Sequence, residues 1–370
     1  MVKPDVYLSI VSMVSFILPQ LVLDHNILWQ TTFVYFLGYL GFILPFSLPR
    51  ITMLGFNRVF GYDYRLKWPL RLLFKSYMPL IIVLLFFAWN FRVRNIIGIP
   101  GFESSHPDAG VLYYIFTAGY FVFISLYLLY AKNSSKRLLI FVILLIFYGL
   151  YQAALGWRQG LFDVILFLAV LYQNKSRNLT KLLKTSLVAF VSSSIAITLV
   201  LASSFRERSF SFVGTWERFF GIKFLNTVVD WFVKIKHNDI FFNDFFIFEL
   251  ARLNMSTSKY HNHIIMGQTF VNGEARTGFG SIYMLLGSVG VFFAFLLIGL
   301  FYKVIWQVYR DFYNNVYCMI LYALSIIILQ RIVLEQLDIG VLIHLLSYVF
   351  FIVVFHISFK IIGIQSARIN

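Results

Sequence analysis

The sequence has few charged residues and a single cysteine. Charged residues make up 13% of its 370 residues and hydrophobic residues 60%, whereas a soluble chain is about a quarter charged and about half apolar. This balance leaves too little polar surface to cover a globule in water, so it predicts a polytopic membrane protein with one integral membrane domain over residues 1–370. The lone Cys318 excludes an intramolecular disulfide and a thiolate metal site.

Several motifs of well-known chemistry are also absent from the sequence. There is no G-x-x-x-x-G-K-[ST], which disfavours ATP-driven transport by this chain, and no H-E-x-x-H or G-x-S-x-G, which leaves metalloproteases and serine hydrolases without support. No Asp-x-Asp pair is present to hold a metal-bound nucleotide sugar. His261 and His263 have no clear third ligand nearby, so we predict no metal site and no cofactor.

Apolar runs long enough to cross a bilayer fill most of the chain. The hydrocarbon core needs roughly 20 residues of helix, and somewhat fewer where flanking side chains reach the interface. Such runs lie near residues 6–23, 27–47, 77–91, 111–130, 138–155, 160–172, 185–204, 279–301, 316–330 and 339–357. The sixth run is the shortest, contains Asp163, and is expected to form a tight hairpin with the fifth. The predicted fold is an all-α polytopic membrane protein with about ten transmembrane helices.

The basic residues favour one orientation of these spans. With the N-terminus in the cytoplasm, the inner segments hold 18 basic and three acidic residues, whereas the outer segments hold 13 basic and 12 acidic residues. Both termini are therefore expected in the cytoplasm. The net charge of +15 is explained by cytoplasmic loops rather than by nucleic acid. The first run has no small-residue cleavage site and is expected to be a retained helix.

One outer connection is far longer than the others. Residues 205–276, between spans seven and eight, form a predicted periplasmic loop subdomain of about 72 residues, and loops of this length are usually functional. It contains regularly spaced aromatic residues: Trp216, Phe219, Phe220, Phe224, Trp231, Phe232, Phe241, Phe242, Phe245 and Phe246. Two interpretations stay open, that these aromatics anchor amphipathic helices at the outer membrane interface, or that they line a sugar-binding cleft.

The outer turn between spans five and six contains Arg158, flanked by Gly156 and Gly160. Its guanidinium could simply reach the membrane surface. The flanking glycines also allow a bulky anion to approach closely. A third possibility is an ion pair with Asp163 inside the bundle.

A second outer cluster lies at the two ends of the large loop. Arg206 and Arg208 leave span seven, and Glu274 and Arg276 precede span eight. Arginines facing outward suit a lipid-linked phosphate or pyrophosphate, although each could equally anchor to lipid headgroups. His261 and His263, just before, could move protons near neutral pH. Small residues in 277–290 predict close helix packing at the start of span eight.

This layout resembles the Wzy-type oligosaccharide repeat-unit polymerases of bacterial O-antigen or capsule assembly. The resemblance rests on the number of spans, on Gly156 and Arg158 at a mid-chain outer turn, on the late outer loop, and on the glycine-rich entry to the next helix. Some members show an Arg-x10-Gly pattern, which Arg276 and Gly287 match, whereas Arg158 is followed by Ala169 at that place. The likeness is one of architecture over nearly the full length.

The resemblance implies a metal-independent glycosyl transfer at the periplasmic face of the inner membrane. A growing glycan on undecaprenyl pyrophosphate would move to a hydroxyl of the next lipid-linked repeat unit. The residues that would hold the pyrophosphate are Arg158, Arg206 and Arg276. The base would be His263, with His261 or Glu274 as rivals. Partners would be the lipid-linked oligosaccharide, membrane lipid, a chain-length regulator and the flippase of the same pathway.

Three other functions are compatible with parts of the sequence. An O-antigen ligase would keep the fold and donor but pass the glycan to a lipid A core. A non-enzymatic lipid-linked oligosaccharide flippase would have more spans, charges within several helices and no large outer loop. A membrane acyltransferase would need a histidine near the first helices, where His25 is the candidate.

Overall fold

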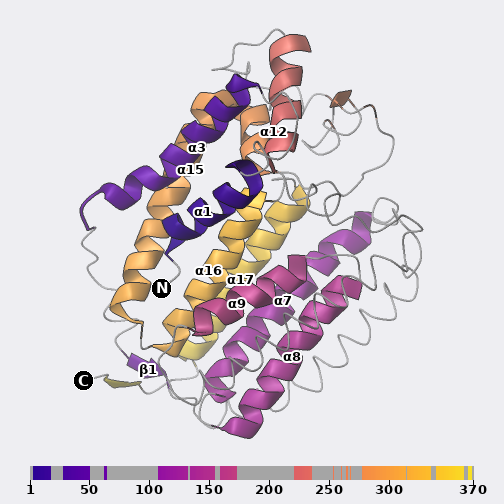
Figure 1. Ribbon diagram of the computed structural model, residues 1–370. Coiled ribbons are helices and arrows are strands. Elements are labelled where there is room, and N and C mark those ends of the chain that lie inside the picture. Colours follow the sequence, from indigo (N-terminus) through magenta and orange to yellow (C-terminus); the bar gives the residue numbers. More distant parts are fainter. Residues whose placement is uncertain are drawn as a thin grey trace.

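The computed structural model describes residues 3–17, 28–50, 62–64, 107–131, 134–154, 159–172, 221–235, 253, 260, 264–265, 267, 277–313, 315–334, 339–361 and 366–368. These residues are almost entirely helical (Figure 1). The helices are α1 (Pro4–Ser12), α3 (Trp29–Ser47), α7 (Pro107–Ala131), α8 (Ser135–Ala154), α9 (Gln159–Tyr172), α12 (Gly221–Asp230), α15 (Gly278–Asp311), α16 (Val316–Leu334) and α17 (Ile339–Ile361). π-Helical turns continue α1 over Met13–Ile17 and α12 over Trp231–Ile235. Strands β1 (Tyr62–Tyr64) and β2 (Ser366–Arg368) pair antiparallel.

Eight of the ten predicted spans coincide with α1 and its π-turn, α3, α7, α8, α9, α15, α16 and α17. The runs at 77–91 and 185–204 lie outside the described residues. Among the described residues, two helices are long and apolar enough to cross a membrane, Gly278–Asp311 and Val316–Val333. The described part of the chain is therefore consistent with a helical membrane protein.

The predicted ends of two spans need correction. The first is α7, which begins at Pro107, inside the segment expected to be an outer connection. Proline suits the first turn of a helix because its missing N–H would have no partner there. The second is α15, which runs to Asp311, ten residues beyond its apolar run. Its last turns carry Lys303 and Arg310, so the helix continues after the hydropathy has fallen.

Two groups of helices meet at α16. On one side α15 lies along α3, and on the other α16 contacts α9 and α7, while α17 lies against α7 (Figure 1). The α8–α9 hairpin expected from the sequence is confirmed, since the two helices pack against each other. The fully buried core is rich in tyrosine and phenylalanine, including Tyr148, Tyr302, Tyr317, Tyr322, Phe121 and Phe167.

The outward faces of the helices are apolar. On α15 the exposed side chains include Phe293, Leu297 and Phe301, one helical turn apart, and on α17 they include Leu346, Phe350 and Val353. Regularly spaced large apolar side chains on an outer face are unfavourable in water and are typical of a surface that meets lipid or a partner.

Close packing between α3 and α15 depends on glycine. A Cβ atom at Gly41 would lie 2.5 Å from the carbonyl oxygen of Phe292, and one at Gly299 would overlap the carbonyl of Phe42. Because neither glycine has a side chain, the two backbones approach each other directly. The sequence prediction of close packing at the start of span eight is confirmed at Gly280, where a Cβ would lie 2.5 Å from the ring of Phe224.

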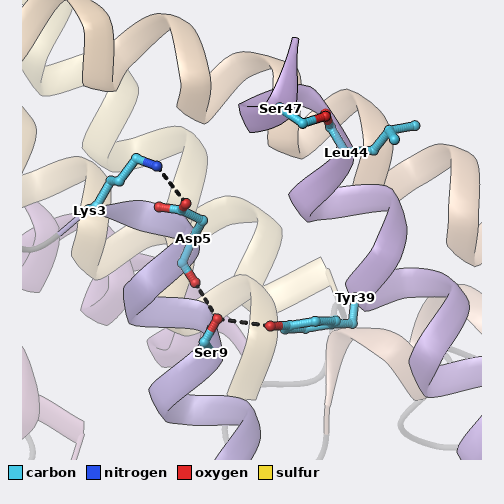
Figure 2. A network of polar contacts seen from close by, with 6 residues as sticks. All are labelled: Lys3, Asp5, Ser9, Tyr39, Leu44 and Ser47. Atoms are coloured by element: carbon cyan, nitrogen blue, oxygen red, sulfur yellow. Dashed lines mark hydrogen bonds and ion pairs between the residues drawn. The ribbon is translucent and has the colours of Figure 1, made fainter.

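Several polar contacts lie at the start of α1 and between α1 and α3 (Figure 2). Lys3 Nζ lies 2.7 Å from Asp5 Oδ2, and Ser9 Oγ donates to the carbonyl oxygen of Asp5 at 2.8 Å and lies 2.8 Å from Tyr39 Oη, which links α1 to α3. The Lys3 ammonium also lies 5.6 Å from the centre of the Phe46 ring.

The C-terminal end of α3 is bound by basic and acidic residues of α15. Lys303 Nζ donates to the carbonyl oxygens of Leu48 and Pro49, at 2.8 and 2.7 Å. Arg50 forms an ion pair with Asp311. Lys3, Arg50 and Lys303, which the charge pattern assigns to one side of the membrane, therefore lie at one end of the bundle.

Candidate functional site

Six residues were predicted to bind or transform the substrate, and all of them lie outside the described residues. They are Arg158, Arg206, His261, His263, Glu274 and Arg276. Their sequence neighbours give the local framework. Gln159 begins α9 directly after Arg158, and Thr277 caps α15 directly after Arg276. The Thr277 hydroxyl oxygen accepts a hydrogen bond from the Gly280 N–H at 3.2 Å.

Helix α12 lies within the predicted large loop and packs on the starts of α3 and α15. Asn226 Oδ1 accepts hydrogen bonds from the Leu28 N–H at 2.9 Å and from Thr31 Oγ1 at 2.8 Å. It thereby satisfies a backbone N–H at the start of α3 that no side chain of α3 itself caps. Phe224 of α12 packs on Gly280 of α15. The loop is thus joined to two long helices at one end of the bundle.

The aromatic residues of this segment are core residues. Phe224, Trp231 and Phe232 are buried, and Trp231 meets Tyr260 edge-on with ring centres 5.3 Å apart. For these residues both interpretations of the sequence are wrong, since the side chains pack against protein rather than anchor the loop at the interface or line a cleft. The other loop aromatics, Trp216, Phe219, Phe220, Phe241, Phe242, Phe245 and Phe246, lie outside the described residues.

The most unusual polar feature of the described residues is an ion pair buried in the bundle. Arg331 Nη2 donates to Asp163 Oδ2, and the two side chains are 3% and 0% exposed. Asp163 lies in the second turn of α9, and Arg331 lies in the last turn of α16. The pair therefore joins two helices through charges removed from solvent.

This pairing corrects the sequence analysis. Arg158, five residues before Asp163, was one possible partner for it, and Arg331 lies just beyond the predicted span at 316–330. The structure instead buries Arg331 within α16, whose last turn continues through Ile332, Val333 and Leu334. A cation followed by further apolar residues in the same run was the signal that could have placed Arg331 inside the bundle.

One aromatic ring lies close to the ion pair, and further rings pack behind it. The Arg331 guanidinium lies 5.9 Å from the centre of the Tyr348 ring of α17, within the range of cation–π attraction. Tyr348 meets Phe121 of α7 edge-on at 6.3 Å, and Phe121 meets Phe167 of α9 at 5.5 Å. These apolar surroundings strengthen the attraction between the two charges and raise the cost of leaving either one alone.

The ion pair lies toward the same end of the bundle as the start of α15. Helix α15 ends at Asp311, α16 begins at Val316, and the two helices contact each other as antiparallel neighbours, so the start of one lies near the end of the other (Figure 1). Arg331 is three residues from the end of α16, and Asp163 is four residues from the start of α9. Buried ionisable residues in a membrane bundle are rare and usually mark a functional region.

The comparisons with known proteins add no family assignment. No family model, no curated protein and no solved structure matches the chain. Function must therefore be argued from the residues themselves.

Proposed function

We propose that this chain is a membrane glycosyltransferase that joins undecaprenyl-pyrophosphate-linked oligosaccharide repeat units into O-antigen or capsular polysaccharide. The observation that carries the proposal is the ion pair of Asp163 with Arg331. Because Asp163 has a counter-ion on α16, a pair with Arg158 is not needed to neutralise it, and we assign the positive charge of Arg158 to an anionic substrate. Phosphate groups, such as those of a pyrophosphate, are anions that arginine binds through paired hydrogen bonds.

The contacts of α12 with α3 and α15 support a site that is shared by the loop and the helix bundle. Asn226 and Phe224 hold the loop on the starts of α3 and α15, and Thr277 at the start of α15 directly follows Arg276. In the proposed arrangement the loop lies over the end of the bundle that carries both arginine-containing turns.

The proposed reaction needs cations and one base. The bond between the anomeric carbon of the growing glycan and the pyrophosphate oxygen breaks, and a bond from that carbon to the acceptor hydroxyl oxygen forms. Arg158, Arg206 and Arg276 stabilise the negative charge on the departing pyrophosphate. The base that takes the hydroxyl proton is His263, with His261 and Glu274 as rivals.

The proposed setting is the bacterial inner membrane. About ten helices span it, both termini are cytoplasmic, and the loop over residues 205–276 is periplasmic. The flippase of the same pathway supplies the lipid-linked repeat unit, and a chain-length regulator is a further partner. A tag inserted at residue 240 should react with periplasmic reagents, and cytoplasmic labelling would overturn this topology.

The decisive test uses purified protein and a synthetic lipid-pyrophosphate repeat unit. Arg158→Gln and Arg276→Gln should each reduce polymer formation by roughly 100-fold or more, as expected when a group that stabilises developing charge is removed. Lys223→Gln is the matched control, because Lys223 is an exposed cation on α12 and should keep wild-type activity. Wild-type polymer ladders from both arginine variants would reject their assigned role.

Two further outcomes separate the proposal from its alternatives. A deletion strain that still carries lipopolysaccharide with single repeat units indicates a polymerase, whereas one that carries none indicates a ligase. Chelators should leave polymer formation unchanged, and a reaction that EDTA stops and metal restores would contradict the metal-independent mechanism.

A further inference from the structure

We infer that Asp163 and Arg331 form a positioning pair, which fixes the start of α9 against α16 and α17 and thereby sets the point from which Arg158, the residue directly before α9, extends. The inference rests on the proposed function for its catalytic consequence. Its structural part stands on the described contacts alone.

The geometry of the pair restrains α9 near its first turn. Asp163 is four residues from Gln159, at which α9 begins, so the distance along the helix axis is about 6 Å. Arg331 holds the Asp163 carboxylate from α16, and Tyr348 covers the guanidinium from α17. Three helices thus meet at one polar contact close to the start of α9.

The pair is more than a means of stabilising the bundle. Helix α9 is only 14 residues long, and its other buried side chains, Val164, Phe167, Leu168, Val170 and Leu171, are apolar. Apolar contacts permit small slides and rotations, whereas a charged hydrogen bond between two buried groups has a specific geometry. A buried ion pair of this kind contributes little net stability compared with apolar residues of similar size, so its value lies in fixing position.

Arg158 is the residue directly before α9 in the sequence. Four residues, 155–158, separate the end of α8 at Ala154 from the start of α9. A shift of α9 along α16 therefore moves the attachment point of Arg158. Misplacement of a binding group by about 1 Å can reduce the rate of a reaction about 100-fold.

The test replaces both charges together by apolar residues. Asp163→Leu with Arg331→Met leaves no unpaired charge, so the double variant should fold and remain in the membrane. We expect its polymer formation to fall about 100-fold through kcat, with protein yield unchanged. Arg331→Lys, which keeps the charge, should recover part of the activity. Arg50→Gln, which removes the exposed ion pair with Asp311, is the control and should behave as wild type.

A distance measurement gives a readout independent of activity. Spin labels on Gln159→Cys and Leu346→Cys report the separation of the start of α9 from the exposed face of α17. The native Cys318 is buried and can stay in place. In the double variant the distance distribution should shift or broaden beyond its wild-type width.

The outcomes are distinct. An unchanged distance distribution, or a changed distribution with wild-type activity, would overturn the positioning role. If the wild-type protein makes no polymer but the distribution still broadens in the double variant, the structural restraint is supported and the proposed function is the part that fails.

Discussion

The helices on the two sides of α16 are held together in different ways. Between α3 and α15, glycines let the backbones touch, and Gly41 and Gly299 each face a carbonyl of the opposite helix. Between α9 and α16, two buried charges meet instead. Where the surroundings are apolar, helices gain little from the hydrophobic effect on pairing, so small residues and polar contacts supply the specificity. The α3–α15 interface therefore allows close backbone contact, whereas the α9–α16 interface fixes the position of one helix along the other.

The largest loss of stability is expected when one charge of the buried Asp163–Arg331 pair is removed. Arg331→Met leaves the Asp163 carboxylate buried without its counter-ion, which should destabilise the protein by about 3–5 kcal/mol. The measurement is thermal unfolding in detergent, together with protein recovered from the membrane. If the single variant were as stable as the Asp163→Leu, Arg331→Met double variant, the two charges would not be coupled.

An intermediate loss of stability is expected from changes at the interface between α3 and α15. Gly41→Ala places a methyl group against the Phe292 carbonyl, and such overpacking typically costs about 1–3 kcal/mol. The matched control is Leu40→Ala on the same helix, since Leu40 is exposed on the outer face and loses few contacts. Equal losses from both changes, measured by thermal unfolding, would mean that α3 and α15 do not depend on close backbone approach.

The smallest change in stability should come from the exposed ion pair of Arg50 with Asp311, at the opposite end of the bundle from the buried pair. Arg50 and Asp311 have side chains 59% and 33% exposed, and ion pairs at such sites contribute about 0–1 kcal/mol. Arg50→Gln should therefore shift the unfolding temperature little, and less still in high salt. A loss comparable to that of Arg331→Met would show that burial is not what separates the two pairs.

Local pattern was sufficient to predict the helices but not their partners. The apolar runs at 27–47 and 138–155 match α3 and α8 to within three residues, because a long run without a charged residue leaves the backbone few alternatives to helix. The glycine-rich start of span eight also predicted close packing, which Gly280 shows. The break in α15 at Gly287, where φ is 70°, favours glycine, but the sequence alone does not distinguish it from a packing glycine.

The candidate site was harder to predict for a physical reason. Asp163 and Arg331 are 168 positions apart, and no local periodicity indicates which cation an acid will meet across a bundle. The partner that the sequence offered for Asp163, as one possibility among three for Arg158, was an arginine five residues away in the chain. The six predicted substrate residues stay predictions, since they lie outside the described part of the chain.

The separation of the two charges also bears on how the protein is made. Asp163 leaves the ribosome 168 residues before Arg331, which corresponds to roughly 10–30 s at about 5–20 residues per second. During that interval α9 carries an acid without its counter-ion, and an unpaired charge is unfavourable in apolar surroundings. The α8–α9 hairpin therefore reaches its final packing only after α16 has been synthesised.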